Sequence, residues 1–555
     1  MSANRWDPVW PLLGALLFAA LLLPNLAHPL FWADEAETAM FGRRVLEYGY
    51  PKVHGRRNVV YQFGPNIAVG VKEGPDAYIG TTWGQFYFAA PGLVWARGSP
   101  DPYTRTFRAR LPFALAGAAG VGLWLAALLP VFAGDRPRQL RFAGAYLLCA
   151  ALSISLLLHL REVRYYALVV LLGGAIFRVH LGYLVYQRVG FGRWTAELAL
   201  LLFLLFHTFF QAFFAFGALL GLERLVAIWR GRGCWRELAP FAAAGLAVLP
   251  FLWWFEILST ASAFAESFRF SAAGWASNLR DVAGHFLRHE FLGPALVCRL
   301  AALATGAGSP AGRRVAGGLA LFALGFVLLG CVNPLALERY FVVLSPLVTG
   351  VFLLDAFALV ARFSSAARPA AALVTVAALI LGTVALRAPA FTATRGRLHE
   401  LATPYRGPLD HAIPYLLAEY ERPEQLVIAT NYEEYAFMYY LGSHVIVGLS
   451  GNNRLSDRRQ SADVIVPRRR WPASLRELMP HLQKGGYREQ RFPVEDVHFN
   501  NVPALSRSRF IPAPHRFESP ASDDPEKQLV LFLRAPDEVE RGGASPAAIG
   551  SRGGG

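Results

Sequence analysis

Long apolar runs separated by short charged segments constrain this chain more than any other feature of its sequence. The first run, Val9 to Leu30, is nearly uninterrupted, and about 20 helical residues suffice to cross the hydrocarbon core of a bilayer. The run from Ala196 to Trp229 is too long for one span, so we divide it at His207 and Thr208. The pattern predicts about eleven membrane-spanning helices, near residues 9–30, 111–133, 142–160, 165–186, 196–209, 211–229, 238–257, 291–307, 317–333, 340–361 and 370–389.

The composition agrees with a polytopic membrane protein. Of the 555 residues, 54% are hydrophobic and only 17% are charged, which argues against a soluble enzyme. The net charge is +15, but the arginines are scattered through the loops instead of forming one stripe, so we expect no nucleic-acid partner. The cysteines are far apart and give neither a disulfide framework nor a zinc-binding spacing. They are Cys149, Cys234, Cys298 and Cys331.

The arginine-rich loops predict how the chain is oriented. They fall on alternate sides of successive spans and therefore share one face, which the positive-inside tendency makes cytoplasmic. These loops are 135–141, 188–193, 230–236, 313–314 and 362–368. The long first loop (about 31–110), the turns near 161–164 and 333–340, the loop 258–290 and the tail after residue 390 are then extracytoplasmic.

The tail differs in character from the rest of the chain. Charge rises after residue 390, and proline separates short β-like runs at 425–429, 462–466 and 528–533, with an amphipathic stretch at 433–441. We therefore expect a membrane domain over residues 1–390 and an extracytoplasmic soluble α/β domain over 391–541. Residues 542–555 are rich in Gly, Ser and Ala, which predicts a disordered tail.

Three polar sites lie on the predicted extracytoplasmic face. They are Asp34-Glu35-Ala36-Glu37, Arg161-Glu162-Val163-Arg164-Tyr165-Tyr166 and Glu338-Arg339-Tyr340. Each has a structural explanation, because acids cap helix N-termini while Arg and Tyr anchor helices at the membrane interface. Anchoring does not explain an acid in all three, since a carboxylate adds nothing to it. We therefore expect the three sites to meet in one active site, with Glu37 the most suited to a capping role.

The order of these motifs resembles a known superfamily. The motifs are Asp34-Glu35, the aromatic and proline-bearing segment 82–91, Ala109-Arg110-Leu111-Pro112, 162–168, and Glu338-Arg339-Tyr340. Together they resemble the GT-C glycosyltransferases, in particular the bacterial relatives of the protein O-mannosyltransferases and of the lipid A aminoarabinose transferase. The resemblance covers roughly residues 9–390. It implies a multi-pass enzyme of the bacterial plasma membrane. Such an enzyme moves a sugar from a polyprenyl-phosphate donor to a hydroxyl of a protein, lipid or polysaccharide, with inversion.

The resemblance also implies roles for individual residues. An attacking hydroxyl must lose its proton, for which Asp34 is the expected base, with Glu35 in support. Glu162 matches a second acidic position of the superfamily, where it orients the acceptor, holds an arginine or ligates a divalent metal ion. A leaving lipid phosphate needs cations, and arginine suits bidentate contact. The expected phosphate ligands are Arg161, Arg164, Arg339 and Lys72, and the expected substrate contacts are Tyr165, Glu338 and Tyr340.

Two features leave alternatives open. The family's Lys-Pro-Pro-like motif before the first-loop helix is replaced by Thr81-Thr82-Trp83-Gly84-Gln85, which weakens any assignment of the sugar. His285 and His289 have the spacing of metal ligands on a helix, although exposed amphipathic segments contain such pairs by chance. No cofactor is assigned, and the need for a divalent metal ion stays open.

The main rival is a multi-span transporter or lipid flippase. Such proteins usually carry ionisable residues at mid-membrane, whereas here the polar residues gather at one face.

Overall fold

The computed structural model describes residues 9–55, 57–60, 70–267, 271–364, 382, 388–447, 460–469, 475–497 and 519–535. The chain divides into two compact units. The first contains the described residues up to Val53 and those from 70 to 405, and the second contains 54–60 together with the described residues from Arg406 onward. The boundary expected at residue 390 therefore lies 15 residues before the end of the first unit at Tyr405.

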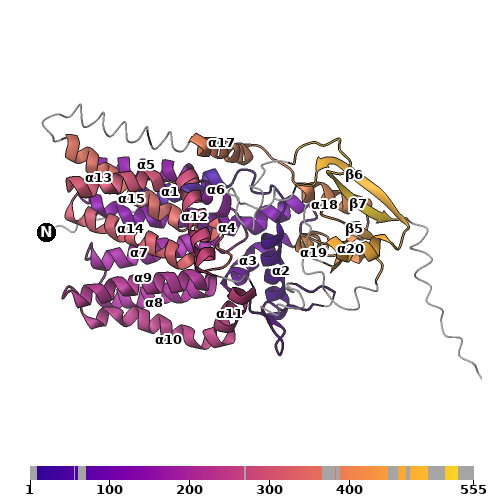
Figure 1. Cartoon of the computed structure of the whole chain (residues 1–555), viewed down its shortest axis with the longest axis horizontal. Helices are drawn as coiled ribbons and strands as arrows, with labels where there is room; N and C mark the ends of the chain where they lie inside the picture. The colour runs from indigo at the N-terminus through magenta and orange to yellow at the C-terminus, as the bar shows by residue number, and fades with distance from the viewer. Residues whose placement is uncertain are drawn as a thin grey trace, which may run out of the picture. The chain divides into compact units, whose positions relative to one another are not determined.

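The first unit is a bundle of helices (Figure 1). Its early elements are α1 (Val9–Leu22), α2 (Ala33–Tyr48), β1 (Val71–Lys72), β2 (Ala77–Tyr78), α3 (Gly84–Ala96), α4 (Pro102–Leu128), η1 (Leu129–Phe132), α5 (Arg136–Ala151), α6 (Ile154–His159) and α7 (Tyr166–Leu184). The others are α8 (Phe191–Thr208), α9 (Phe210–Trp229), η2 (Trp235–Leu238), α10 (Ala239–Trp254), α11 (Ile257–Ser267), α12 (Ala272–His289), α13 (Leu292–Thr305), α14 (Pro310–Gly330), η3 (Glu338–Phe341), α15 (Leu344–Ser364) and α17 (Ala388–Ala402).

Every predicted span up to residue 361 has a helix in its place, including the division near His207, where α8 ends at Thr208 and α9 begins at Phe210. Within the described residues, six helical stretches are long and apolar enough to cross a membrane, and α1 and α13 are shorter apolar helices. The chain is thus a polytopic helical membrane protein. The predicted span 370–389 lies almost entirely outside the described residues, as do residues 542–555.

Two predicted spans are cut short or interrupted at a local sequence signal. The first stops at Leu22 instead of Leu30, because Pro24 disfavours helical geometry at the preceding residue and cannot donate a backbone hydrogen bond. The span 142–160 is broken between Ala151 and Ile154. There the Ser153 side chain accepts a hydrogen bond from the Leu156 amide and so caps the new helix α6.

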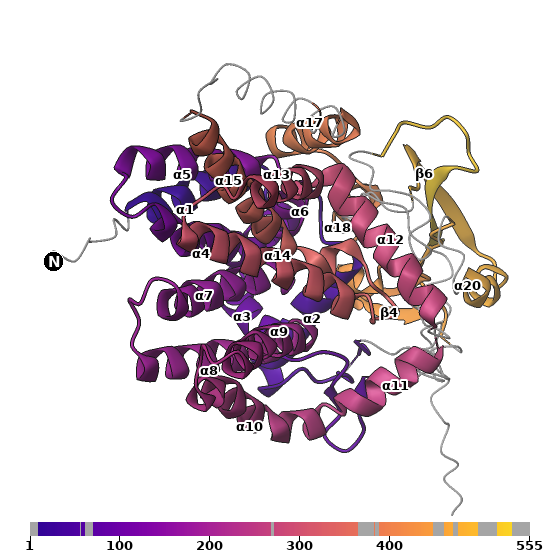
Figure 2. The same cartoon turned by 60° about the vertical axis from the view of Figure 1, so that its left-hand side comes forward.

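Helix α4 lies at the centre of the first unit, between α1, α3 and α7. Small residues let these helices approach closely. A side chain at Gly120 would meet the Leu171 backbone of α7 at 2.8 Å, and one at Gly122 would meet the Pro11 carbonyl of α1 at 2.7 Å. Helices α8, α9 and α10 pack side by side beside this core (Figure 2).

The predicted α/β domain is present as the second unit. It consists of α18 (Pro408–Glu419), η4 (Pro423–Gln425), β3 (Val427–Thr430), α19 (Glu434–Tyr440), β4 (His444–Val447), β5 (Val464–Val466), α20 (Leu475–Leu482), β6 (Tyr487–Glu495) and β7 (Gln528–Arg534). The sheet order is β4-β3-β5-β7-β6, with β3 parallel to both neighbours and β7 antiparallel to β5 and β6. Strands β4 and β6 were not predicted, and the three predicted runs became β3, β5 and β7.

A short piece of the first loop completes the second unit. The Asn58 amide donates to the Ser443 carbonyl at 2.8 Å, and its oxygen accepts from the Val445 amide at 2.8 Å. This side chain thus pairs with the outer edge of β4. The unit is therefore built from two distant parts of the sequence, which the prediction of a contiguous tail did not anticipate.

Replacing Gly84 by Ala should destabilise the first unit. An added Cβ would lie 2.5 Å from the His207 carbonyl oxygen at the end of α8, so α3 and α8 would have to separate, at a cost of about 1–3 kcal/mol. Thermal unfolding of the purified protein in detergent measures the effect. The control is Gly98→Ala, whose added Cβ meets nothing within 4 Å. Equal melting temperatures for the two variants would contradict the close approach.

Candidate active site

The first turn of α2 carries two acids with different environments. Asp34 and Glu35 lie where the positive end of the helix dipole favours negative charge. Successive helical residues point about 100° apart, so the two carboxylates face different neighbours. The Glu35 side chain is fully buried, whereas the Asp34 side chain is 25% exposed.

Glu35 is held by a two-pronged ion pair with Arg110 of α4. Nε of Arg110 donates to Oε1 of Glu35 at 2.8 Å, and an Nη donates to Oε2 at 2.5 Å. The other Nη donates to the carbonyls of Leu26 and Pro29, and the Val163 amide donates to Oε1 of Glu35 at 3.0 Å. The carboxylate therefore joins α2, α4 and the loop before α7.

Asp34 lies between two arginines that come from different hairpins. Its Oδ2 is 3.5 Å from an Nη of Arg164 and 3.5 Å from an Nη of Arg339. The other Nη of Arg164 donates to the Asp34 carbonyl at 3.2 Å and to the Thr38 hydroxyl at 3.1 Å. The three sites expected to meet thus do meet, around Asp34.

Both arginines are buried against aromatic rings. Arg339 lies over Trp32 and Tyr340, 5.0 and 5.7 Å from the ring centres, and Arg164 lies 5.4 Å from that of Tyr165. Burial by itself lowers the pKa of Arg164, but the charges of Asp34 and Glu37 outweigh it and raise that pKa above its ordinary value. Two permanent positive charges therefore flank one partly exposed carboxylate.

Glu162 forms a separate buried pair with His159. Its Oε1 lies 3.0 Å from Nδ1 of His159, and its Oε2 has no hydrogen-bond partner among the described residues. Burial, followed by the charge of Glu35, raises the pKa of Glu162 well above its ordinary value. In this loop Glu162 can therefore hold a proton at a pH where an exposed glutamate has lost it.

The other residues that the sequence predicted for the site make contacts of different kinds. Glu338 and Tyr340 belong to η3 beside Arg339, and Tyr165 stacks on Phe209 at 4.4 Å. Arg161 donates to the Pro24 carbonyl at 2.6 Å. Burial and the charges of Arg397 and Arg110 lower its pKa.

Lys72 is placed against the end of α10. Its Nζ donates to the Trp254 carbonyl at 3.0 Å, lies 3.2 Å from Glu256 and sits over the Trp253 and Trp254 rings. None of these contacts involves the residues around Asp34.

Sequence reasoning gave no role to several residues that shape the site. Arg110 belongs to a motif used for the resemblance, yet no local pattern pairs it with an acid 75 residues away. Arg397 of α17 donates to the Leu157 carbonyl at 3.2 Å and pairs with Glu400. It thereby places a helix from beyond the last predicted span beside α6.

The suggested histidine pair has other contacts. Nε2 of His285 lies 3.1 Å from the Ser155 hydroxyl, and Glu290 at the end of α12 accepts from the Ser153 hydroxyl at 2.7 Å. These bonds join α12 to the start of α6. In the part of the chain that the structure describes, no group of three or more His, Cys, Asp or Glu side chains is placed to hold a metal ion.

Comparison with solved structures identifies the fold. The structure superposes on the crystal structure of ArnT from Cupriavidus metallidurans in the apo state with a TM-score of 0.50 and 14% sequence identity, covering 95% of this chain and 98% of that chain. The chain has the ArnT fold. This confirms the fold implied by the resemblance to GT-C glycosyltransferases.

A second ArnT structure, bound to undecaprenyl phosphate, gives a TM-score of 0.48 and 13% identity over 95% of this chain and 99% of that chain. No family model and no curated protein sequence matches.

Replacing Arg110 by Met should unfold the protein at markedly lower temperature. The change leaves the Glu35 carboxylate buried without its cation, which costs about 3–5 kcal/mol. The comparison variant Arg193→Met removes an exposed pair with Glu197 on α8, worth about 0.3–0.5 kcal/mol. Thermal unfolding in detergent measures both. Similar losses for the two variants would show that the Glu35–Arg110 pair is not a major structural link.

Proposed function

We propose that this protein is an integral-membrane glycosyltransferase. It moves a sugar from a polyprenyl-phosphate carrier to a hydroxyl of a protein, lipid or polysaccharide acceptor. The observation that carries the proposal is the partly exposed Asp34 carboxylate between the guanidinium groups of Arg164 and Arg339. The shared ArnT fold supports it.

This arrangement suits an inverting displacement. The acceptor oxygen attacks the anomeric carbon and passes its proton to the Asp34 carboxylate, while the bond from that carbon to the phosphate oxygen breaks. The electron pair leaves with the lipid phosphate, whose added negative charge Arg164 and Arg339 stabilise. Atoms and charges balance without a further reactant.

The location of the arginines suits a lipid-linked donor. Arg164 lies two residues before α7, and Arg339 lies in η3, shortly before α15. Both helices are apolar and long enough to span a bilayer, so their ends lie at the depth of lipid phosphates. A donor can therefore keep its polyprenyl chain in the hydrocarbon while its phosphate reaches the site.

The contacts of Asp34 also suggest how the base becomes available. In the structure an Nη of Arg164 and an Nη of Arg339 each lie 3.5 Å from its Oδ2. A donor phosphate would compete for the same guanidinium groups and draw them away from Asp34. Donor binding would thereby turn a paired carboxylate into a general base.

Glu162 supplies a second protonated group in this proposal. Its raised pKa favours the neutral carboxyl, which can donate a hydrogen bond to a substrate oxygen or to His159. Glu35 has a positioning role, since both of its oxygens are bound by Arg110 and Val163. Lys72 and Arg161 stay candidate phosphate ligands by resemblance.

Replacing Asp34 by Asn should abolish sugar transfer while leaving the fold intact. The amide cannot accept the hydroxyl proton, and loss of a general base typically costs about 10²–10⁴-fold in rate. Consumption of polyprenyl-phosphate sugars by the purified protein measures the loss. The control is Glu47→Gln, an exposed acid on the same helix. Near-normal turnover by the Asp34 variant would remove this residue as the base.

The proposed orientation places the active site outside the cytoplasm, and the natural cysteines allow a direct test. Cys234 is exposed in a predicted cytoplasmic loop, while the other three cysteines are buried. A membrane-impermeant thiol reagent added to intact cells should label Gly98→Cys, in the first loop, but not Cys234. After permeabilisation both should react. Labelling of Cys234 alone in intact cells would invert the orientation.

A further inference from the structure

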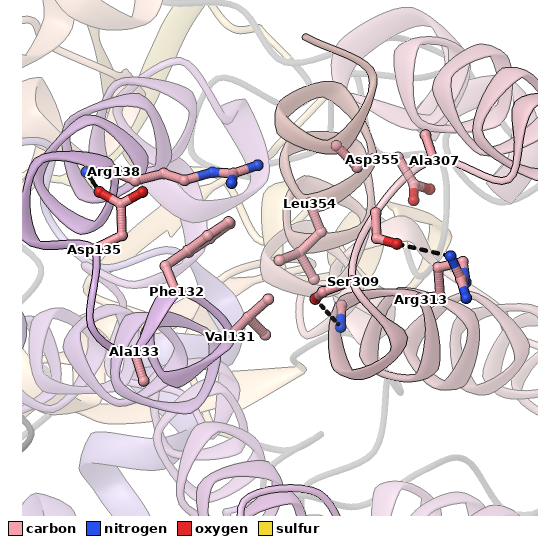
Figure 3. A pocket seen from close by; sticks show the side chains of 13 residues that line it. Val131, Phe132, Ala133, Asp135, Arg138, Ala307, Ser309, Arg313, Leu354 and Asp355 are labelled. Carbon is pink, nitrogen blue, oxygen red and sulfur yellow. Dashed lines mark hydrogen bonds between the residues drawn. The ribbon is translucent and has the colours of Figure 1, made fainter. Parts of the chain in front are cut away.

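A cavity lies at the end of the helices remote from Asp34. It encloses about 170 Å³ between η1, the start of α5, the start of α14 with the residues just before it, and the middle of α15 (Figure 3). None of the residues assigned to the active site lines it. Its lining includes the charged side chains of Arg138 and Arg313 and the apolar side chains of Val131, Phe132 and Leu354.

The depth of the cavity follows from helix α4. Arg110, which binds Glu35 in the active site, and Val131, which lines the cavity, are 21 residues apart on a continuous helical stretch. At about 1.5 Å per residue this separation is about 30 Å, which matches the thickness of the hydrocarbon core. If Arg110 lies at one membrane surface, the cavity therefore lies at the headgroup level of the opposite leaflet.

The polar side of the cavity carries two arginine charges with no carboxylate partner among the described residues. Arg138 donates through one Nη to the Phe357 carbonyl at 3.1 Å. Arg313 donates through one Nη to the Gly306 and Gly308 carbonyls at 3.1 and 2.7 Å. A guanidinium has five N–H donors, so both keep donors for another acceptor.

The two acids of the cavity are engaged elsewhere. Asp355 pairs with Arg299 at 3.1 Å, and Asp135 accepts the backbone amide of Arg138 at 3.0 Å as the cap of α5. Among the described residues, neither acid forms an ion pair with the guanidinium group of Arg138 or Arg313. Figure 3 shows the Arg138 side chain extending from α5 towards α15, with the apolar side chains of Phe132 and Leu354 beside it.

We propose that this cavity binds the phosphodiester headgroup of a membrane glycerophospholipid from the leaflet opposite to the active site. The arginines bind the phosphate oxygens by charge-assisted hydrogen bonds. Val131, Phe132 and Leu354 contact the glycerol backbone and the first methylene groups of the acyl chains. The bound lipid contacts α5, α14 and α15 together. This site is distinct from the donor site and does not depend on transferase activity.

Calorimetric titration of the purified protein in detergent tests the proposal. The probes are dihexanoyl phosphatidylglycerol, dihexanoylglycerol and inorganic phosphate. We expect saturable binding of the phospholipid only. The double variant Arg138→Gln, Arg313→Gln should weaken it by about tenfold or more, as expected for loss of charge-assisted hydrogen bonds. The control Arg193→Gln, an exposed arginine at the start of α8, should bind normally.

A second variant keeps the test independent of the arginines' effect on folding. Ala133 is an exposed residue of the cavity lining, and Ala133→Leu fills the space without changing charge. It should weaken phospholipid binding while the melting temperature without lipid stays unchanged. Undiminished binding by both variants would overturn the proposal. So would equal binding of dihexanoylglycerol, or saturation by inorganic phosphate that blocks the phospholipid, which would indicate a free-phosphate site.

Discussion

The ion pair between Glu35 and Arg110 is the interaction on which the rest of the site depends. Burying two charges is costly, and the geometry offsets that cost through two parallel N–H···O bonds and a third from the Val163 amide. The pair fixes the start of α2 against α4 and against the loop that carries Glu162 and Arg164. Removing either partner would therefore move several elements together.

This arrangement places the neighbouring carboxylates of Glu35 and Asp34 in different environments. Glu35 has both oxygens hydrogen-bonded and its side chain is fully buried, so it offers no exposed surface to a substrate. Asp34, one residue earlier, is partly exposed, and its ionic partners in the described part of the chain are Arg164 and Arg339, each 3.5 Å away. The rigid pair thus allows the adjacent acid to stay polar, accessible and weakly held at the edge of apolar helices, where an unsupported carboxylate would be costly.

The sequence predicted what depends on local pattern and missed what depends on distant pairing. Apolar period and length located the spans, and arginine-rich motifs located the three loops that meet at Asp34. Periodicity does not report pairs such as Glu35 with Arg110 or Asn58 with the edge of β4, because their partners are 75 and about 385 residues away. Proline at position 24 and the cap at Ser153 were local signals for the two helix ends that the hydropathy pattern placed wrongly.

Arginine side chains lie at both ends of the helices, but their hydrogen-bond partners differ between the two ends. At the Asp34 end the arginines of the cluster have an acid within reach, so a phosphate must displace that acid to bind. At the cavity end Arg138 and Arg313 donate to backbone carbonyls and form no ion pair with a carboxylate among the described residues, so a phosphate can bind without displacing a carboxylate there. Exchange of partners suits a substrate that arrives and leaves, whereas arginines of this second kind suit a resident lipid. The separation of the two ends by about the thickness of a bilayer fits the proposed donor site at one membrane surface and the proposed lipid site at the other.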